Sequence, residues 1–203
     1  MTNQDPQQIR TLAILRGCAA DLAGDLAQRC WDAGIDLVEV PVQNDESWRA
    51  LDAVLARSDG RLVGAGTVID TTRAHRAIAA GVGVLITPGL DESVVEAAKA
   101  ADVAILPGVM SPSEVQHGMR LGLKALKLFP IGALGTDYLR ALRPVFPETA
   151  FVVTGGVSPA NAEELVVAGA NALAFGGRLE SVLADDHVMA VAAQIERPWS
   201  LRA

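Results

Sequence analysis

Residues 120–130 read RLGLKALKLFP, and this stretch contains one complete junction between a helix and a strand. A helical segment closes on Gly122, because glycine accepts the left-handed conformation that ends many helices. A short apolar run follows at once and stops at Phe129-Pro130. The stretch therefore predicts one helix-to-strand step of an alternating α/β fold.

The same junction occurs four times along the chain. Helix-like segments close on Gly34, Gly81, Gly122 and Gly169, which lie 47, 41 and 47 residues apart. Each interval holds two β/α units, and strand-like runs begin near Thr11, Asp36, Arg61, Gly83, Val103, Lys124, Ala150 and Asn171. Eight short units predict a (β/α)8 TIM barrel. A doubly wound open sheet is the alternative, because the same alternation builds one.

The length predicts a single domain over residues 1–203. We expect a short helix over residues 4–10 across the barrel floor, and a tail over residues 197–203 in which Trp199 is exposed. A net charge of −7 gives nucleic acid or an anionic membrane no broad basic surface to bind. The expected partner is therefore a small molecule.

The cysteines and the N-terminal residues bear on the compartment. Cys18 and Cys30 are too few and too poorly spaced for a disulfide framework, and residues 1–8 are polar without an apolar signal segment. No apolar run is long enough to span a bilayer. These features predict a cytoplasmic protein. Since His75, His117 and His187 lack metal-ligand spacing, neither a metal nor another cofactor is expected.

Lys127 is the residue that most suggests chemistry. The chain has 17 lysine and arginine residues, of which three are lysines, and Lys127 lies inside a run that reads as a buried strand. Burial disfavours an ammonium, and a neutral amine in a pocket is what Schiff-base formation with a carbonyl substrate needs. Lys124 and Lys99 read as solvated lysines.

Strand alternation predicts which polar side chains accompany Lys127. If Val38, Val40 and Val42 face the helices, then Glu39 points into the barrel. The same argument turns Arg16, Lys127 and Phe129 inward, and it sets Val63, Ala65 and Thr67 along one inward line. A glutamate, a lysine, an arginine and a threonine would then meet at the C-terminal end of the barrel, where such folds build active sites. A purely structural Glu39–Lys127 pair is the alternative.

Glycine pairs follow the last two strands, in Thr154-Gly155-Gly156 and Gly176-Gly177-Arg178. Backbone N–H groups at these two loops form the usual phosphate site of a (β/α)8 barrel. We therefore expect a bound phosphate or carboxylate there, with tight-turn glycines as the alternative.

Six short motifs, in order along the chain, resemble the class I 2-keto-3-deoxy-6-phosphogluconate and 2-keto-3-deoxy-6-phosphogalactonate aldolases. They are Glu39-Val40-Pro41, Gly64-Ala65-Gly66-Thr67-Val68, Thr87-Pro88-Gly89-Leu90, Pro107-Gly108-Val109, Leu126-Lys127-Leu128-Phe129-Pro130 and Thr154-Gly155-Gly156-Val157-Ser158-Pro159-Ala160-Asn161. The resemblance implies a (β/α)8 homotrimer in which Lys127 forms the Schiff base and Glu39 is the general acid/base. It places Thr67 at the pyruvate end and Pro88 among the substrate-binding residues.

Two positions depart from the resemblance. The phosphogluconate branch commonly carries an arginine where this chain has Gln43, so Arg16 is the residue expected to bind the pyruvate carboxylate. Arg178 stands where a small or acidic residue is more usual, which leaves open whether it grips a phosphate or crowds it out.

The predicted reaction is cleavage of a 2-keto-3-deoxy-(6-phospho)sugar acid to pyruvate and an aldehyde. A 4-hydroxy-2-oxoglutarate or other unphosphorylated keto-acid aldolase fits the same site. A phosphate-binding barrel isomerase and a non-catalytic binding barrel are the remaining alternatives.

Overall fold

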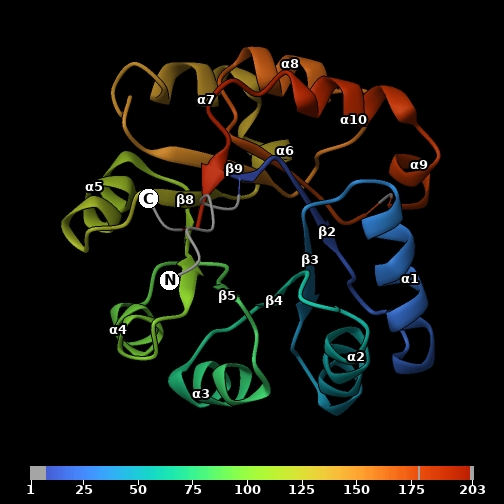
Figure 1. Cartoon of the computed structure of the whole chain (residues 1–203). Coiled ribbons are helices and arrows are strands. Elements are labelled where there is room, and N and C mark those ends of the chain that lie inside the picture. The colour runs from blue at the N-terminus through green and yellow to red at the C-terminus, as the bar shows by residue number, and fades with distance from the viewer. Residues whose placement is uncertain (1–7, 178, 202–203) are drawn as a thin grey trace, which may run out of the picture.

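A computed structural model describes residues 8–177 and 179–201. Its parallel strands are β2 (Thr11–Ile14), β3 (Leu37–Pro41), β4 (Leu62–Gly66), β5 (Val84–Ile86), β6 (Ala104–Leu106), β7 (Gly108–Val109), β8 (Ala125–Leu128), β9 (Ala150–Thr154) and β10 (Ala172–Phe175). Hydrogen bonds join them in the order β6-β5-β4-β3-β2-β10-β9-β8-β7. Figure 1 shows them as a ring enclosed by helices.

The ring closes because β6 and β7 are two halves of one strand. Pro107 separates them, and proline has no N–H to donate to a ladder. Its carbonyl still accepts a hydrogen bond of 2.9 Å from the Lys127 N–H of β8. The two ends of the strand order therefore belong to the same strand. This confirms the (β/α)8 barrel and excludes the open doubly wound sheet.

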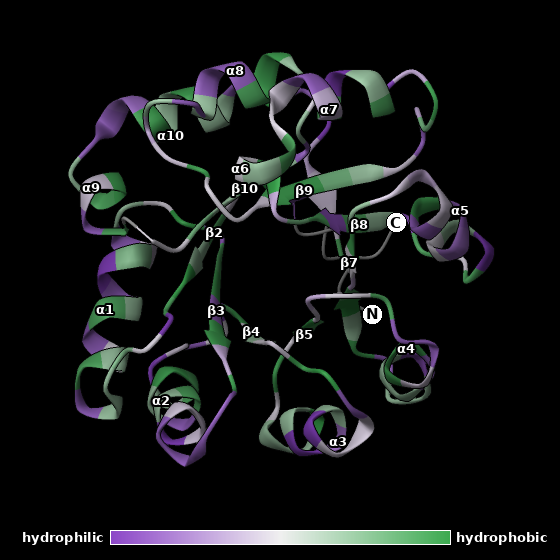
Figure 2. Ribbon diagram, turned by 180° about the vertical axis from the view of Figure 1, so that it is seen from behind, coloured by the Kyte–Doolittle hydropathy of each residue, from purple (hydrophilic) through white to green (hydrophobic). Residues whose placement is uncertain are grey.

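Helices surround the strands. They are α1 (Ala20–Asp32), α2 (Asp45–Ala56), α3 (Thr71–Ala80), α4 (Glu92–Ala100), α5 (Pro112–Arg120), α6 (Ile131–Leu134), α7 (Thr136–Leu142), α8 (Ala162–Val167), α9 (Leu179–Leu183) and α10 (Asp186–Ala193). The four junction glycines have φ values of 86°, 89°, 74° and 99°, the left-handed conformation that the sequence predicted. In Figure 2 the strands are mostly hydrophobic, whereas the helices carry both colours. The helices are thus amphipathic covers for the barrel.

Two apolar layers form the core. Alternate strand residues, among them Val38, Val40, Leu126 and Leu128, pack outward against the helices. The other set, including Leu12, Leu37 and Val152, fills the barrel interior.

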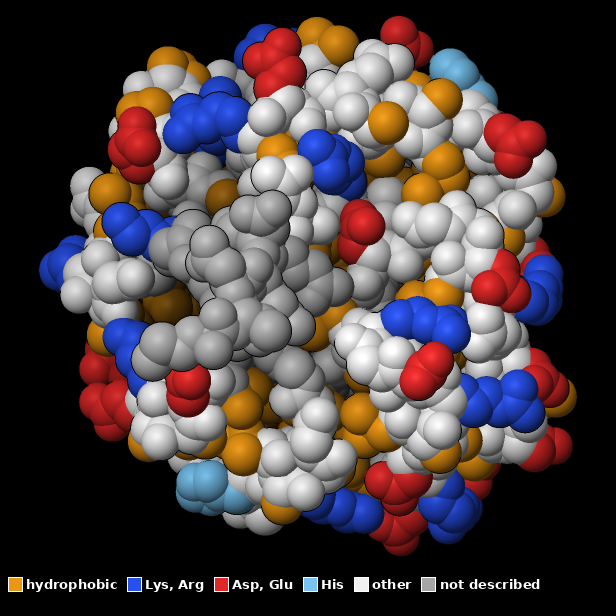
Figure 3. Space-filling view, in the orientation of Figure 1, with side chains coloured by type: hydrophobic (Ala, Val, Ile, Leu, Met, Phe, Trp, Pro, Cys, Tyr) orange, Lys and Arg blue, Asp and Glu red, His pale blue; other side chains and the backbone are white. Residues whose placement is uncertain are grey.

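On the face drawn in Figure 3, acidic and basic side chains are intermixed rather than gathered by sign. None of the described helices is long and apolar enough to cross a membrane.

The floor of the barrel differs from the prediction. The predicted helix over residues 4–10 is wrong at its described end, because Gln8–Ile9 form strand β1, antiparallel to β11 (Trp199–Ser200); residues 4–7 lie outside the described residues. The expectation of an exposed Trp199 is also wrong, since its side chain is 3% exposed and packs with Ile9 in the barrel interior. The interior needs an apolar closure at its N-terminal end, and these two side chains supply it.

The third strand also differs from the prediction. Val63 and Ala65 pack toward the helices, and the inward positions belong to Gly64 and Gly66. The inward line of Val63, Ala65 and Thr67 is therefore wrong. The alternation ends before Thr67, whose φ of 57° is unusual for a β-branched residue. Both residue sets on this strand are small or apolar, so hydrophobicity alone did not distinguish its two faces.

Candidate active site

Lys127 and Glu39 are buried charged side chains in the barrel interior. Lys127 lies on β8 and is 6% exposed, and Glu39 lies on β3 and is 1% exposed. Their strand neighbours Leu126, Leu128, Val38 and Val40 face the helices, so alternation turns both charged groups inward. The inward direction predicted for both residues is confirmed.

Glu39 has an unusual environment for a carboxylate. Its Oε1 is buried and has no hydrogen-bond partner among the described residues. Burial raises the pKa of Glu39 above its usual value, while the positive charges of Lys127 and Arg16 act in the opposite direction. A carboxyl group that holds a proton more tightly than usual, close to a lysine, is suited to both accepting and returning protons.

This pKa direction makes a prediction about stability. Because the folded state binds the Glu39 proton more tightly than the unfolded chain, stability falls as pH rises above the unfolded value of about 4.3. Glutamine at position 39 cannot ionise. Glu39→Gln is therefore expected to be more stable than the wild type at pH 8, on the order of 1 kcal/mol or about 2–4 °C in Tm. Denaturant unfolding at several pH values measures the difference.

The difference between the two proteins should shrink as the pH is lowered to about 3, below the unfolded value, where the wild-type carboxyl is protonated in both states. Glu96→Gln, exposed on α4 and without an ion pair among the described residues, is a control for the loss of one negative charge. A Glu39→Gln difference that does not change with pH would contradict the assignment.

Gly66 is the residue that makes room for Glu39. A Cβ at position 66 would lie 1.9 Å from Glu39 Oε1 and 2.6 Å from its Cδ. Neither strand can give way easily, because Pro41 and Gly66 are paired in the β3–β4 register. Glycine at position 66 is thus a steric requirement of the buried carboxylate. It was quoted in a motif but not predicted as a site residue, because the inward line predicted for this strand consisted of the alternate residues.

Gly66→Ala therefore tests whether the position of Glu39 matters. We expect kcat to fall by about 100-fold, the usual cost of displacing a catalytic group by about 1 Å. Steady-state kinetics with far-UV circular dichroism measures the effect in a folded protein. Gly89→Ala is the matched control, since nothing lies within 4 Å of a Cβ at that position. Equal activity of both variants would show that Glu39 does not need its present position.

Phe129 connects the lysine to the loop after β9. Lys127 Nζ lies 5.3 Å from the centre of the Phe129 ring. A Cβ at Gly155 would lie 2.8 Å from two atoms of the same ring, so the Gly155 backbone packs directly on Phe129. Lys127, Phe129 and Gly155 therefore lie close together in the structure.

Gly132 supports this loop from α6 and was missed in the sequence. Its N–H donates a 2.7 Å hydrogen bond to the Gly155 carbonyl. A Cβ at Gly156 would lie 2.7 Å from Gly132 Cα, so the two backbones are in close contact. Gly155 and Gly156 have φ values of 78° and 106°, which point the loop away from the strand direction. The only signal in the sequence was a glycine two residues after Pro130.

The other predicted residues lie around the same end of the barrel. Arg16 is exposed just after β2, and its positive charge acts to lower the pKa of Glu39. Thr154 is buried at the end of β9, whereas Thr67 is half-buried and Gly177 exposed. Gly176 is half-buried, and a Cβ there would lie 3.4 Å from Ile14 Cβ. Arg178 lies outside the described residues.

Pro88 follows β5 and is exposed, and its carbonyl lies against the Gly108 backbone. The neighbouring Thr87 is 2% exposed and donates its hydroxyl hydrogen to the Gly89 carbonyl. Thr87 was quoted only as part of a motif. Across residues 8–177 and 179–201, no three His, Cys, Asp or Glu side chains are grouped to hold a metal ion.

Comparisons with known proteins identify the family. The family model "Aldolase: KDPG and KHG aldolase" matches residues 4–192. The chain is 32% identical to the 2-dehydro-3-deoxy-6-phosphogalactonate aldolase of Escherichia coli K12 over 170 residues, 83% of each chain. A native KDPGal structure superposes with a TM-score of 0.83 at 28% identity, covering 96% of this chain and 98% of the other.

A second solved structure carries chemical information. KDPG aldolase from Legionella pneumophila, with pyruvate captured at low pH as a covalent carbinolamine intermediate, has a TM-score of 0.79 and 26% identity to this chain. The match covers 95% of this chain and 96% of that one. On the family model and these similarities, the chain belongs to the KDPG and KHG aldolase family and is a carbon–carbon lyase.

Proposed function

We propose that this chain is a class I aldolase that reversibly cleaves a 2-keto-3-deoxy-6-phospho sugar acid to pyruvate and glyceraldehyde 3-phosphate. The observation that carries the proposal is a buried Lys127 on the inward face of β8, facing the same interior as the buried Glu39. The covalent pyruvate adduct of the Legionella relative supports the same type of chemistry here.

In the proposed mechanism, Lys127 Nζ attacks the C2 carbonyl and forms a carbinolamine. Loss of water gives an iminium, which accepts the electron pair of the C3–C4 bond when that bond breaks. The C4 hydroxyl loses its proton, and the fragment that begins at C4 leaves as the aldehyde. The resulting enamine is protonated at C3, and water then hydrolyses the iminium to release pyruvate and the free amine.

Glu39 is proposed to move the protons of these steps. Its buried carboxyl has an unpartnered oxygen and a raised pKa, which suit a group that alternates between acid and base. It would remove the C4 hydroxyl proton, directly or through a water, and reprotonate the enamine. Phe129 would shield the imine from bulk water, because its ring lies beside Lys127 Nζ.

Arg16, Thr67 and Pro88 are proposed to hold the pyruvate end of the substrate. Arg16 follows β2 at the same end of the barrel as Glu39 and offers a guanidinium to the carboxylate. Thr154 and the backbone N–H groups of the two glycine pairs would receive the distal phosphate, with Arg178 as a further proposed contact. This assignment favours phosphorylated substrates.

Borohydride trapping tests the proposal. Incubation with pyruvate and sodium borohydride should add one reduced pyruvyl group to the chain, and peptide mass spectrometry should place it on Lys127. The other two lysines, Lys99 and Lys124, are exposed and act as internal controls. An adduct on either of these alone, or no adduct, would overturn the Schiff-base mechanism.

The substrate class needs a separate measurement. Pyruvate release is compared for 2-keto-3-deoxy-6-phosphogluconate, its galactonate epimer, their unphosphorylated forms and 4-hydroxy-2-oxoglutarate. We expect kcat/KM to be highest for a phosphorylated substrate. Preference for 4-hydroxy-2-oxoglutarate would keep the aldolase mechanism and reject the phosphate assignment.

We also propose that the chain forms a homotrimer in the cytoplasm. Two large apolar side chains at the C-terminal end of the barrel, Ile69 and Met110, are 52% and 51% exposed and would be covered by another copy. Cys18 and Cys30 are both free, as suits a reducing compartment. Light scattering after size-exclusion chromatography and cell fractionation test the two parts.

A further inference from the structure

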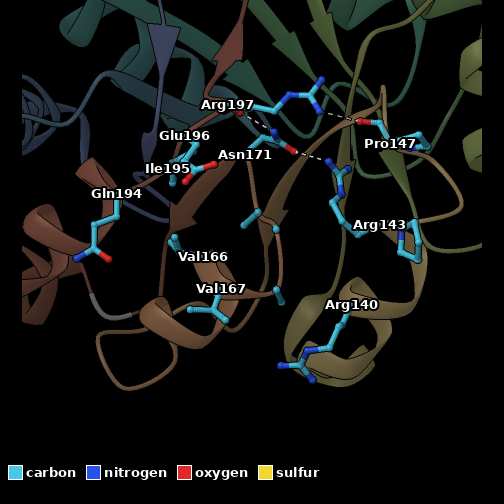
Figure 4. A pocket seen from close by; sticks show the side chains of 14 residues that line it. Arg140, Arg143, Pro147, Val166, Val167, Asn171, Gln194, Ile195, Glu196 and Arg197 are labelled. Carbon is cyan, nitrogen blue, oxygen red and sulfur yellow. Dashed lines mark hydrogen bonds between the residues drawn. The ribbon is translucent and has the colours of Figure 1, made fainter.

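A groove lies at the N-terminal end of the barrel, on the opposite end from the proposed catalytic site. It has a volume of about 740 Å³ and is formed by α7 with the loop after it, the turn between α8 and β10, and the segment after α10. All three segments lead into strands β9, β10 and β11, which places the groove where the strands begin. Figure 4 shows its lining side chains.

Arg143 is held in this groove without a negative partner. Its Nη2 donates to the Thr149 carbonyl at 2.5 Å and its Nη1 to Asn171 Oδ1 at 3.4 Å. The guanidinium also lies over the Phe151 ring, 4.7 Å from its centre. These partners are neutral. Among the described residues no carboxylate lies within ion-pair distance of Arg143, and its buried Nε–H has no hydrogen-bond acceptor.

A second guanidinium, that of Arg197, lies nearby. Asn171 Nδ2 donates to the Arg197 carbonyl at 2.5 Å, so one side chain fixes Arg143 and the Arg197 backbone together. Burial lowers the pKa of Arg143 below its ordinary value, and the positive charge of Arg197 lowers it further. The partly buried positive charge of Arg143 therefore lies near the largely exposed positive charge of Arg197, which is unfavourable unless an anion compensates it.

The acidic side chains around the groove do not supply that compensation. Arg140, at the other end of the lining, is the residue that Asp137 and Glu164 engage. Glu148 lies 3.8 Å from Arg197, but this pair is 66% and 82% exposed and is therefore weak. In Figure 4 the Arg197 guanidinium extends toward Pro147, whereas Glu196 lies on the other side of Asn171.

We propose that this groove binds a small organic anion through a phosphate or carboxylate group held by Arg143 and Arg197. The Nη–H groups of Arg143 that are not bonded to Thr149 or Asn171, together with the guanidinium of Arg197, would donate charge-assisted hydrogen bonds to its oxygens. Val166, Ala168 and Ile195 line the same groove and would contact the apolar part of the ligand. A purely structural role for Arg143 explains its bonds to Thr149 and Asn171 but leaves its charge uncompensated.

The test is an NMR titration of the full chain with inorganic pyrophosphate, and with sodium chloride at matched ionic strength. The Nε–H signals of Arg143 and Arg197 and the Nδ2 signal of Asn171 should shift and saturate with pyrophosphate alone. The Gly155 and Gly156 amide signals report pyrophosphate binding at the other end of the barrel. Shifts that do not saturate, that sodium chloride reproduces, or that occur only at Gly155 and Gly156 would overturn the proposal.

Variants make the test specific. Arg197→Gln should weaken pyrophosphate binding at the groove at least ten-fold, and it avoids the structural bonds that Arg143→Gln would remove. Arg120→Gln, an exposed arginine at the end of α5, should bind like the wild type. Unchanged binding in Arg197→Gln would contradict the site. Lys127→Met leaves the groove intact, so this variant should bind pyrophosphate there like the wild type. This result is expected whether or not Lys127 forms a Schiff base.

Discussion

Lys127→Met is expected to lower kcat/KM for aldol cleavage by about 10⁵-fold or more, because the variant cannot form the covalent intermediate that divides the reaction into easier steps. Methionine is similar in length and apolar, so it fills the inward position on β8 without leaving a large cavity. The measurement is pyruvate release coupled to a dehydrogenase, together with the borohydride adduct, which should also disappear.

Lys124→Met is the matched control for this experiment. Position 124 is exposed, three residues before Lys127 and just outside β8, so the substitution removes the same amine from the same segment. It should leave kcat/KM within about two-fold of the wild type, as expected for a surface substitution. Comparable loss in both variants would indicate a general effect on the strand rather than a Schiff base at Lys127.

Glu39→Gln is expected to retain the Lys127 adduct but to lose most exchange of the pyruvate methyl protons with solvent. Exchange needs a group that removes a proton from the methyl carbon and returns one, and a positioned acid/base contributes about 10²–10⁴-fold to such a step. Glutamine keeps the shape of the glutamate side chain in its pocket beside Gly66 but cannot accept the proton.

Deuterium incorporation into pyruvate, followed by ¹H NMR, measures this exchange. Trapping with borohydride in the same samples checks that the amine still reacts. Glu46→Gln, on exposed helix α2, controls for the loss of a carboxylate elsewhere. Normal exchange in Glu39→Gln would remove Glu39 from the role of acid/base, whereas loss of both exchange and adduct would point to a disturbed pocket.

Much of the fold follows from the sequence, because it depends on local patterns. The four helix-ending glycines fix where β3, β5, β8 and β10 start, and the apolar alternation on β3 and β8 fixes which side chains face inward. Two helix starts obey the same kind of local rule, since the Asp70 side chain caps α3 and Ser111 forms a capping box with Glu114 on α5.

The sequence failed where local pattern carries little information. On β4 both faces are apolar or glycine, so the choice of face depends on neighbouring strands. Gly66 makes room for Glu39 of β3, and Gly64 makes room for side chains of β5. Trp199 looked like part of a polar tail, but the open end of the barrel buries it against Ile9. Neither outcome can be read without the neighbouring element.

The sequence by itself thus determined the alternating β/α units, the inward lysine on β8 and the inward glutamate on β3, because each rests on a pattern within one segment. The closure of these units into a barrel through β6 and β7 required the tertiary structure. The tertiary structure alone decided the contacts across segments. Gly66 gives room to Glu39, and Gly132 supports Gly155 and Gly156. Asn171 holds the Arg143 side chain and the Arg197 backbone near each other. These depend on distances between residues far apart in the chain, which packing fixes and periodicity does not.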